Sequence, residues 1–195
     1  MLDIINVSKS FNKGTPIQKN ALIGLNLHLD KGDFVTVIGG NGAGKSTMLN
    51  AVAGVFNIDK GKIKIDGVDV TKTPEYKRAK YIGRVFQDPL KGTAGDMWIE
   101  ENLAFALRRG KTRSFKWGIS NKEREMFKDL LAPLDLGLEQ RLSAKVKLLS
   151  GGQRQALTLL MATIKEPKLL LLDEHTAALD PKTAKKVLDL TDEII

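Results

Sequence analysis

The chain has 195 residues, of which 42% are hydrophobic and 28% charged, as expected of one globular domain. It has no cysteine, which excludes disulfides and thiolate metal sites, and no apolar run approaches the roughly 20 residues that span a bilayer. The net charge of +8 is compatible with an anionic partner or with a solvated surface. The start, Met1-Leu2-Asp3-Ile4, lacks a basic segment and a long apolar core, so we expect no signal peptide and a cytoplasmic protein.

Two kinds of strand are predicted. Residues 25–30 and 62–65 alternate apolar and polar side chains, which is typical of antiparallel strands with one wet face. Phe34–Ile38 and Leu169–Leu172 are nearly continuous apolar runs, which is typical of central parallel strands buried on both faces. The pattern predicts an α/β fold with an additional antiparallel sheet near the N-terminus.

A glycine-rich loop follows the first apolar run. Residues 39–47, GGNGAGKST, fit the pattern G-x-x-x-x-G-K-S/T between a predicted strand and a helical run. Glycines let the backbone curl so that N–H groups point at a phosphate chain, Lys45 reaches the β- and γ-phosphates, and Ser46 offers a hydroxyl to Mg²⁺. A turn that only joins strand to helix does not need four glycines. The loop predicts a nucleotide site formed by Gly39, Gly40, Asn41, Gly42, Ala43, Gly44, Lys45, Ser46 and Thr47.

The middle of the chain is predicted to be helical. Residues 100–108 and 121–131 have helical patterns, with Gly118 and Pro133 as punctuation. The densest basic run, Arg108 to Lys116, also lies here. A solvated face is the simplest interpretation of that run, and a membrane partner or lipid head groups are the main alternative. No aromatic–basic motif accompanies it, so no nucleic acid is expected as a partner.

Asp173 and Glu174 directly follow the second apolar run. Ligands bind beyond the carboxyl ends of strands in open α/β sheets. A carboxylate at Asp173 is suited to hold Mg²⁺ through its water shell, and Glu174 is then placed to orient or deprotonate an attacking water. The alternative is a pair of ordinary surface carboxylates that close a strand.

The segment Leu149–Gln153, LSGGQ, precedes a helical run. Ser150 and Gln153 have the spacing of a capping box, which alone explains a helix start. A capping box does not require Gly151 and Gly152, each of which costs roughly 1 kcal/mol in a helix interior. The glycines indicate that an anionic group approaches the backbone closely.

Together these motifs resemble the ATP-binding-cassette (ABC) ATPases. The resemblance rests on Gly39–Thr47, Gln87, LSGGQRQ at Leu149–Gln155 and LLLLDEH at Leu169–His175, in the family's order. It implies a P-loop NTPase core with a parallel sheet, an N-terminal antiparallel β-subdomain and a helical insert that carries the signature. The implied division is a core of residues 1–89 and 158–195 with a helical subdomain of residues 90–157.

The resemblance also implies roles for single residues. Phe11 matches the aromatic residue that stacks on adenine, although a core or strand-end phenylalanine is an alternative. Gln87 matches the residue that contacts Mg²⁺ and the attacking water. Lys45 and Glu174 complete the catalytic set, with Ser46, Gln87 and Asp173 on the metal. In a head-to-tail dimer, a second subunit would bind the γ-phosphate through Ser150, Gly151, Gly152, Gln153 and Asp180.

The sequence departs from the family's pattern at its end. Family members carry a switch histidine on a further strand beyond the second acidic motif, and the chain stops at Ile195 before such a strand. We therefore expect a truncated chain that binds ATP and lacks one element used in hydrolysis.

Within the family, the single short cassette is most similar to importer ATPases. The sequences of its motifs resemble those of an importer group linked to aromatic amino acid uptake. The resemblance implies ATP and Mg²⁺ as cofactors, and a second ATPase subunit, membrane permease subunits and a substrate-binding protein as partners. The protein would lie peripherally on the inner face of the cell membrane. The alternatives are a soluble ABC ATPase of translation, repair or chromosome structure, and an exporter cassette.

Overall fold

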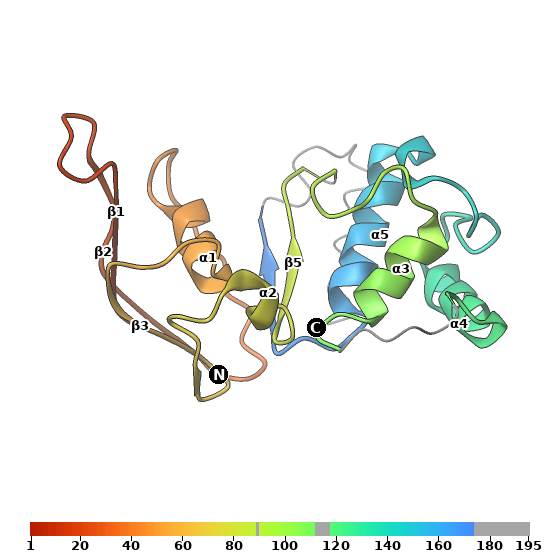
Figure 1. The fold of residues 1–195 in the computed structure, drawn as a ribbon, viewed down its shortest axis with the longest axis horizontal. Helices are drawn as coiled ribbons and strands as arrows, with labels where there is room; N and C mark the ends of the chain where they lie inside the picture. Colours follow the sequence, from red (N-terminus) through yellow and green to blue (C-terminus); the bar gives the residue numbers. More distant parts are fainter. Residues whose placement is uncertain (89, 112–117, 174–195) are drawn as a thin grey trace. The chain divides into compact units, whose positions relative to one another are not determined.

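The structure is a computed structural model that describes residues 1–88, 90–111 and 118–173 (Figure 1). The chain divides into two compact units, Met1–Ile82 and Gly83–Ile195, and each unit is described by itself. Within the described ranges, no helix combines the length and the hydropathy that crossing a membrane requires.

The first unit is built on a four-stranded antiparallel sheet with the strand order β2-β1-β3-β4. Its strands are β1 (Leu2–Phe11), β2 (Lys19–Leu29), β3 (Lys60–Ile65) and β4 (Val68–Asp69). Ile4 on β1 and Ile63 and Ile65 on β3 are buried, while Lys62 is exposed. Burial of alternate residues gives the sheet one wet face. The predicted antiparallel N-terminal sheet is confirmed.

A buried arginine holds the C-terminal end of helix α1 (Lys45–Ala53) in this unit. Arg78 ends the short helix α2 (Glu75–Arg78) and is 1% exposed. Its guanidinium donates hydrogen bonds of 2.7–3.1 Å to the backbone carbonyls of Thr73, Val52, Ala51 and Thr71. Burial lowers the pKa of Arg78, but the carbonyl partners and the negative end of the α1 dipole stabilise its charge.

Replacing Arg78 with methionine is expected to lower the free energy of unfolding by about 3 kcal/mol, because several buried carbonyls lose their donor together. Urea denaturation measures the change. Lys77→Met is the matched control, since Lys77 lies on the same short helix and is exposed. The control should change the stability by no more than about 0.5 kcal/mol. Equal effects of the two substitutions would contradict the role given to Arg78.

The second unit combines helices with a two-stranded sheet. Its elements are β5 (Ile82–Val85), α3 (Ile99–Leu107), α4 (Asn121–Leu131), η1 (Ala132–Leu134), η2 (Val146–Leu148), α5 (Gly151–Thr163) and β6 (Leu169–Leu172). Helix α3 packs against both α4 and α5 (Figure 1). Leu103 of α3, Phe127 of α4 and Leu157 of α5 are fully buried in one core cluster. The predicted helices are confirmed, with bounds that differ by one residue at α3.

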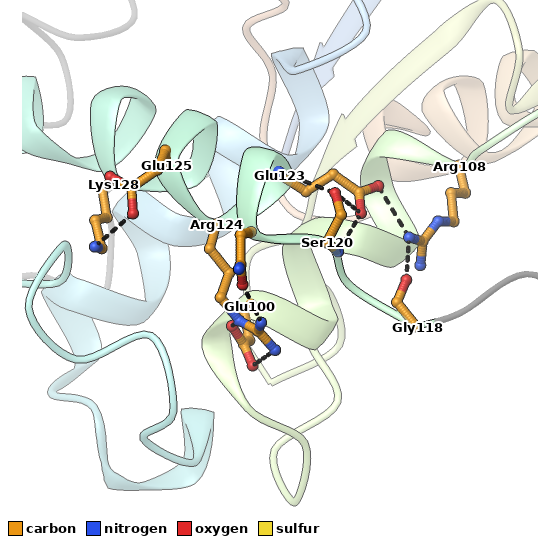
Figure 2. Close-up of polar contacts among 9 residues, drawn as sticks. Glu100, Arg108, Gly118, Ser120, Glu123, Arg124, Glu125 and Lys128 are labelled. Atoms are coloured by element: carbon orange, nitrogen blue, oxygen red, sulfur yellow. Dashed lines mark hydrogen bonds and ion pairs between the residues drawn. The ribbon is translucent and has the colours of Figure 1, made fainter.

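Ion pairs join α4 to α3 and to Arg108, the residue that directly follows α3 (Figure 2). The side chain of Glu100 on α3 is 3% exposed and accepts a hydrogen bond of 2.8 Å from Nε of Arg124 on α4. A buried carboxylate is stable only with such a partner, so this pair fixes where α4 lies on α3. Glu123 closes the capping box of α4, and the backbone N–H of Ser120 holds the pKa of that carboxyl below its usual range.

The basic run is partly structural rather than simply solvated. Arg108 donates to Glu123 at 2.9 Å and to the carbonyl of Gly118 at 2.6 Å. Arg109 donates to the carbonyl of Ala162 on α5 at 3.0 Å, and its burial lowers its pKa. The interpretation as a solvated face is therefore wrong for Arg109. Arg113 and Lys116 of the same run lie outside the described residues.

The buried strand predicted at Phe34–Ile38 is absent from the described sheets. Residues 33–40 pair with no strand, and Phe34 and Ile38 are 64% and 90% exposed. An apolar strand is buried only when neighbouring strands pair with it and other layers cover its faces. The antiparallel sheet of the first unit consists of β1 to β4 and supplies neither. The second apolar run forms β6, in which Leu169 and Leu171 are buried.

Candidate functional site

The glycine-rich loop of the first unit leads into α1 through two glycines in the left-handed region. Gly42 has a φ of 81° and Gly44, the N-cap of α1, a φ of 93°. A Cβ at Gly44 would lie 2.7 Å from the carbonyl oxygen of Ala21, so no other residue fits there. The loop from Gly39 to Ala43 is exposed. The local sequence thus folds a curled backbone that is open to a ligand.

Lys45 extends back over this loop. Its Nζ donates to the carbonyl of Gly39 at 2.5 Å and to that of Gly40 at 3.2 Å. Helix α1 has no side-chain cap and no acidic residue in its first turn. Because the first backbone N–H groups of a helix have no partner within the helix, this end attracts an anion. Ser46 is exposed in the same turn, with its hydroxyl available to a cation beside a phosphate.

Phe11 is the last residue of β1 and is half-buried. Its ring packs edge-on against Phe56 with 5.3 Å between the ring centroids, and Nζ of Lys9 lies 5.3 Å from the centroid of Phe11. These contacts fit the strand-end alternative. They also hold the ring in a fixed orientation, which a stacking platform needs. The role in adenine binding remains a prediction.

In the second unit, β5 and β6 bring Gln87 and Asp173 to one edge. The N–H of Asp173 donates to the carbonyl of Val85 at 3.1 Å, so the C-terminal ends of both strands meet and the strands run parallel. Gln87 lies two residues beyond β5 and is exposed, and Asp173 is half-buried. Glu174 and Asp180 lie outside the described residues.

The signature segment starts α5 with a complete capping box. Ser150 Oγ accepts the N–H of Gln153 at 3.3 Å, and Gln153 Oε1 accepts the N–H of Ser150 at 3.1 Å. Gly152 is buried, whereas Gly151 is exposed and has open space around its Cβ position. The capping box is therefore real, and the first turn of α5 is also open to an anion at Gly151.

Arg154 supports this turn from within the helix and was not among the predicted site residues. Its Nη2 donates hydrogen bonds of 3.1–3.3 Å to the carbonyls of Val146, Lys147 and Leu149. These three residues belong to the segment that directly precedes Ser150. The arginine thus fixes the chain that enters the signature. The motif letters alone do not reveal this contact, because its acceptors are backbone carbonyls that any sequence supplies.

The predicted residues form two sets. The first unit holds the phosphate loop and Phe11, and the second holds Gln87, Asp173 and the segment Ser150–Gln153. Among the described residues, no group of three or more histidine, aspartate or glutamate side chains could hold a metal ion. The first set has the chemistry of a phosphate cradle. The second has a helix terminus that favours an anion, and a carboxylate and an amide oxygen of the kind that bind Mg²⁺.

Comparison with known proteins identifies the family in which these two sets of residues occur together. The family profile described as ABC transporter matches residues 22–177. The chain is 45% identical over 195 residues to a tyrosine transport ATP-binding protein of Clostridioides difficile, covering 100% of this chain and 77% of that protein. It is 36% identical over 187 residues to a spermidine/putrescine import ATP-binding protein of Haemophilus influenzae, covering 96% of this chain and 46% of that protein.

A solved structure is similar in fold as well as in sequence. It is a dimeric ATP-binding cassette in a post-hydrolysis state, bound to ADP and Pi. The TM-score is 0.83 with 28% identity, over 99% of this chain and 82% of that chain. The predicted fold class and the assignment to the ABC ATPases are confirmed by this likeness and by the family match. The chain belongs to the ABC transporter family and is an ATPase domain of that family.

Proposed function

We propose that this protein energises a membrane importer as a head-to-tail dimer that holds ATP between its subunits. The observation that carries the proposal is the glycine-capped N-terminus of α1, where Nζ of Lys45 lies over the loop carbonyls in an ABC ATPase chain. The loop is exposed and cationic and offers backbone N–H groups, so its chemistry fits a triphosphate. All nine residues from Gly39 to Thr47 are assigned to this contact.

The donor set also fits Mg²⁺, which prefers hydroxyl, carboxylate and amide oxygens together with phosphate. We assign Ser46, Gln87 and Asp173 to the ion, which when bound would neutralise charge on the phosphates. Phe11 orients the nucleotide through its base. Glu174 accepts a proton from the attacking water, and Lys45 and Gln87 position the reacting groups.

The second subunit completes the site. Ser150, Gly151, Gly152 and Gln153 lie at a helix start whose backbone is open at Gly151, and such a terminus favours an anion. The phosphate pattern lies elsewhere in the chain, at residues 39–47, so we assign the signature segment, with Asp180, to the γ-phosphate held by the partner. Loss of this phosphate removes a bridge between subunits, which couples hydrolysis to dimer opening.

The names of the relatives support an importer and suggest its cargo. One is a tyrosine transport protein and another an import protein, each similar over nearly the whole of this chain. We therefore propose tyrosine or a related aromatic amino acid as the cargo, with a permease and a substrate-binding protein as partners. The protein would then work at the inner face of the membrane, with its nucleotide sites in residues 1–89 and 158–195 and its signature in residues 90–157.

Uptake measurements test this proposal. Cells that lack the gene should lose energy-dependent uptake of labelled tyrosine, and the wild-type gene should restore it. Lys45→Ala should not restore it, whereas the control Lys62→Ala, on the exposed side of β3, should do so. Uptake of spermidine instead of tyrosine would overturn the cargo, and failure of the protein to co-purify with any permease would overturn the role in import.

A further inference from the structure

One lysine outside every predicted motif lies against the phosphate loop. Lys19 is the first residue of β2 and is exposed. Its Nζ lies 3.5 Å from the position that a Cβ would take at Gly42, within the loop. Gly42 has a φ of 81° and no side chain. No side chain of Gly42 therefore lies between this amine and the backbone of the loop.

The same lysine is paired with Phe11. In the antiparallel ladder between β1 and β2, Lys19 lies directly opposite Phe11. Side chains of a directly opposed pair project from the same face of a sheet. Lys19 therefore joins the two parts of the proposed nucleotide site in the first unit, the aromatic platform at Phe11 and the glycine loop at Gly42.

The charge of Lys19 has no acidic partner in the described part of the chain, unlike that of its neighbours. Lys13 lies 2.9 Å from Asp59 and hydrogen-bonds it, which lowers the pKa of that carboxyl. Nζ of Lys9 lies 3.7 Å from the carboxylate of Asp59 and also donates to the carbonyl of Asn57 at 2.7 Å. An exposed lysine is ordinarily solvated, but Nζ of Lys19 lies at Gly42, in the same loop over which Lys45 extends and just before the N-terminus of α1. Such an arrangement is favourable when an anion occupies the loop.

We propose that Lys19 is a second nucleotide-binding cation, which contacts the α-phosphate while Lys45 serves the β- and γ-phosphates. This inference rests on the proposed roles of the loop and of Phe11. With the base on Phe11 and the terminal phosphates at Lys45, the part of the nucleotide between them is the ribose and α-phosphate. The ammonium at Gly42 belongs to the residue directly opposite Phe11 in the ladder, so it can meet that part.

The α-phosphate assignment makes a specific prediction, because ATP and ADP share that group. Lys19→Gln should raise the Kd for both nucleotides by the same factor, about fivefold for a charged hydrogen bond at an exposed site. The ionic-strength dependence of binding should also become weaker. Lys19→Arg should retain most of the affinity. Isothermal titration calorimetry of the purified protein with ATP and ADP, at low and high salt, gives these values.

Two further variants separate the possible failures. Lys13→Gln removes the same charge from the neighbouring turn and should change the Kd by less than twofold. Lys45→Ala should raise the Kd for ATP by roughly a hundredfold. If Lys45→Ala weakens ATP binding to that extent and Lys19→Gln leaves it unchanged, the role of Lys19 is wrong and the loop assignment stands. If Lys45→Ala binds normally, the proposed site itself is wrong. A larger loss for ATP than for ADP would overturn contact with the α-phosphate.

Discussion

Replacing Lys45 with alanine is expected to raise the Kd for ATP by roughly a hundredfold and to abolish ATP hydrolysis. The ammonium lies over the loop carbonyls of Gly39 and Gly40 and is the cation of the phosphate pattern. Removing one partner of a charge pair in a ligand site costs about 3 kcal/mol, because the phosphate oxygens then lack a donor. Calorimetric titration and a phosphate-release assay measure the two losses.

The control for this substitution is Lys62→Ala. Lys62 is exposed on β3, so the variant removes the same charge and a similar side chain away from the loop. It should bind and hydrolyse ATP like the wild type. Urea denaturation should give similar midpoints for both variants, since the hydrogen bonds of Nζ of Lys45 within the described ranges go to exposed loop carbonyls. Normal ATP affinity in Lys45→Ala would exclude the loop as the nucleotide site.

Glu174→Gln is expected to lower the turnover of ATP by roughly 10²–10⁴-fold, the range that a general base contributes. Glutamine keeps the size of the side chain but cannot accept the proton of the attacking water. The Kd for ATP should stay within about twofold of the wild type, because the phosphates and Mg²⁺ are assigned to other residues. Single-turnover kinetics with labelled ATP separate binding from hydrolysis.

Glu125→Gln provides the matched control for the loss of a carboxylate. Glu125 lies on α4 and pairs with Lys128, three residues further along the same helix. Surface pairs of this kind contribute little, so its turnover should be normal. If Glu174→Gln and Glu125→Gln turn over ATP equally fast, Glu174 is not the base.

Patterns with a local cause were predicted well from the sequence. The alternation at 62–65 predicted β3 because burial on one face is a property of neighbouring residues. Helix α4 begins and ends where expected, and its capping box, Ser120 with Glu123, is encoded within four residues. The spacing of Ser150 and Gln153 predicted a second capping box for the same reason.

Features that depend on distant partners were not predicted. Arg78 hydrogen-bonds backbone carbonyls of α1 that lie more than twenty residues away in the sequence. Arg154 hydrogen-bonds carbonyls of the segment that precedes Ser150. Backbone acceptors leave no trace in the sequence. Nζ of Lys19 lies at Gly42, more than twenty residues further along the chain. The apolar pattern of Phe34–Ile38 predicted a buried strand. Burial also depends on the strands and helices that pack around a segment, and the pattern of the segment does not reveal these.

The mass of the Glu174→Gln protein in solution tests the central claim, that ATP is held between the loop of one subunit and Ser150–Gly152 of another. We predict by light scattering a monomer without nucleotide and a dimer with Mg²⁺ and ATP. Adding Gly151→Asp, which places a carboxylate at the open first turn of α5, should leave a monomer that still binds ATP. An ATP-bound monomer of the single variant, or a dimer of the double variant, would contradict the claim.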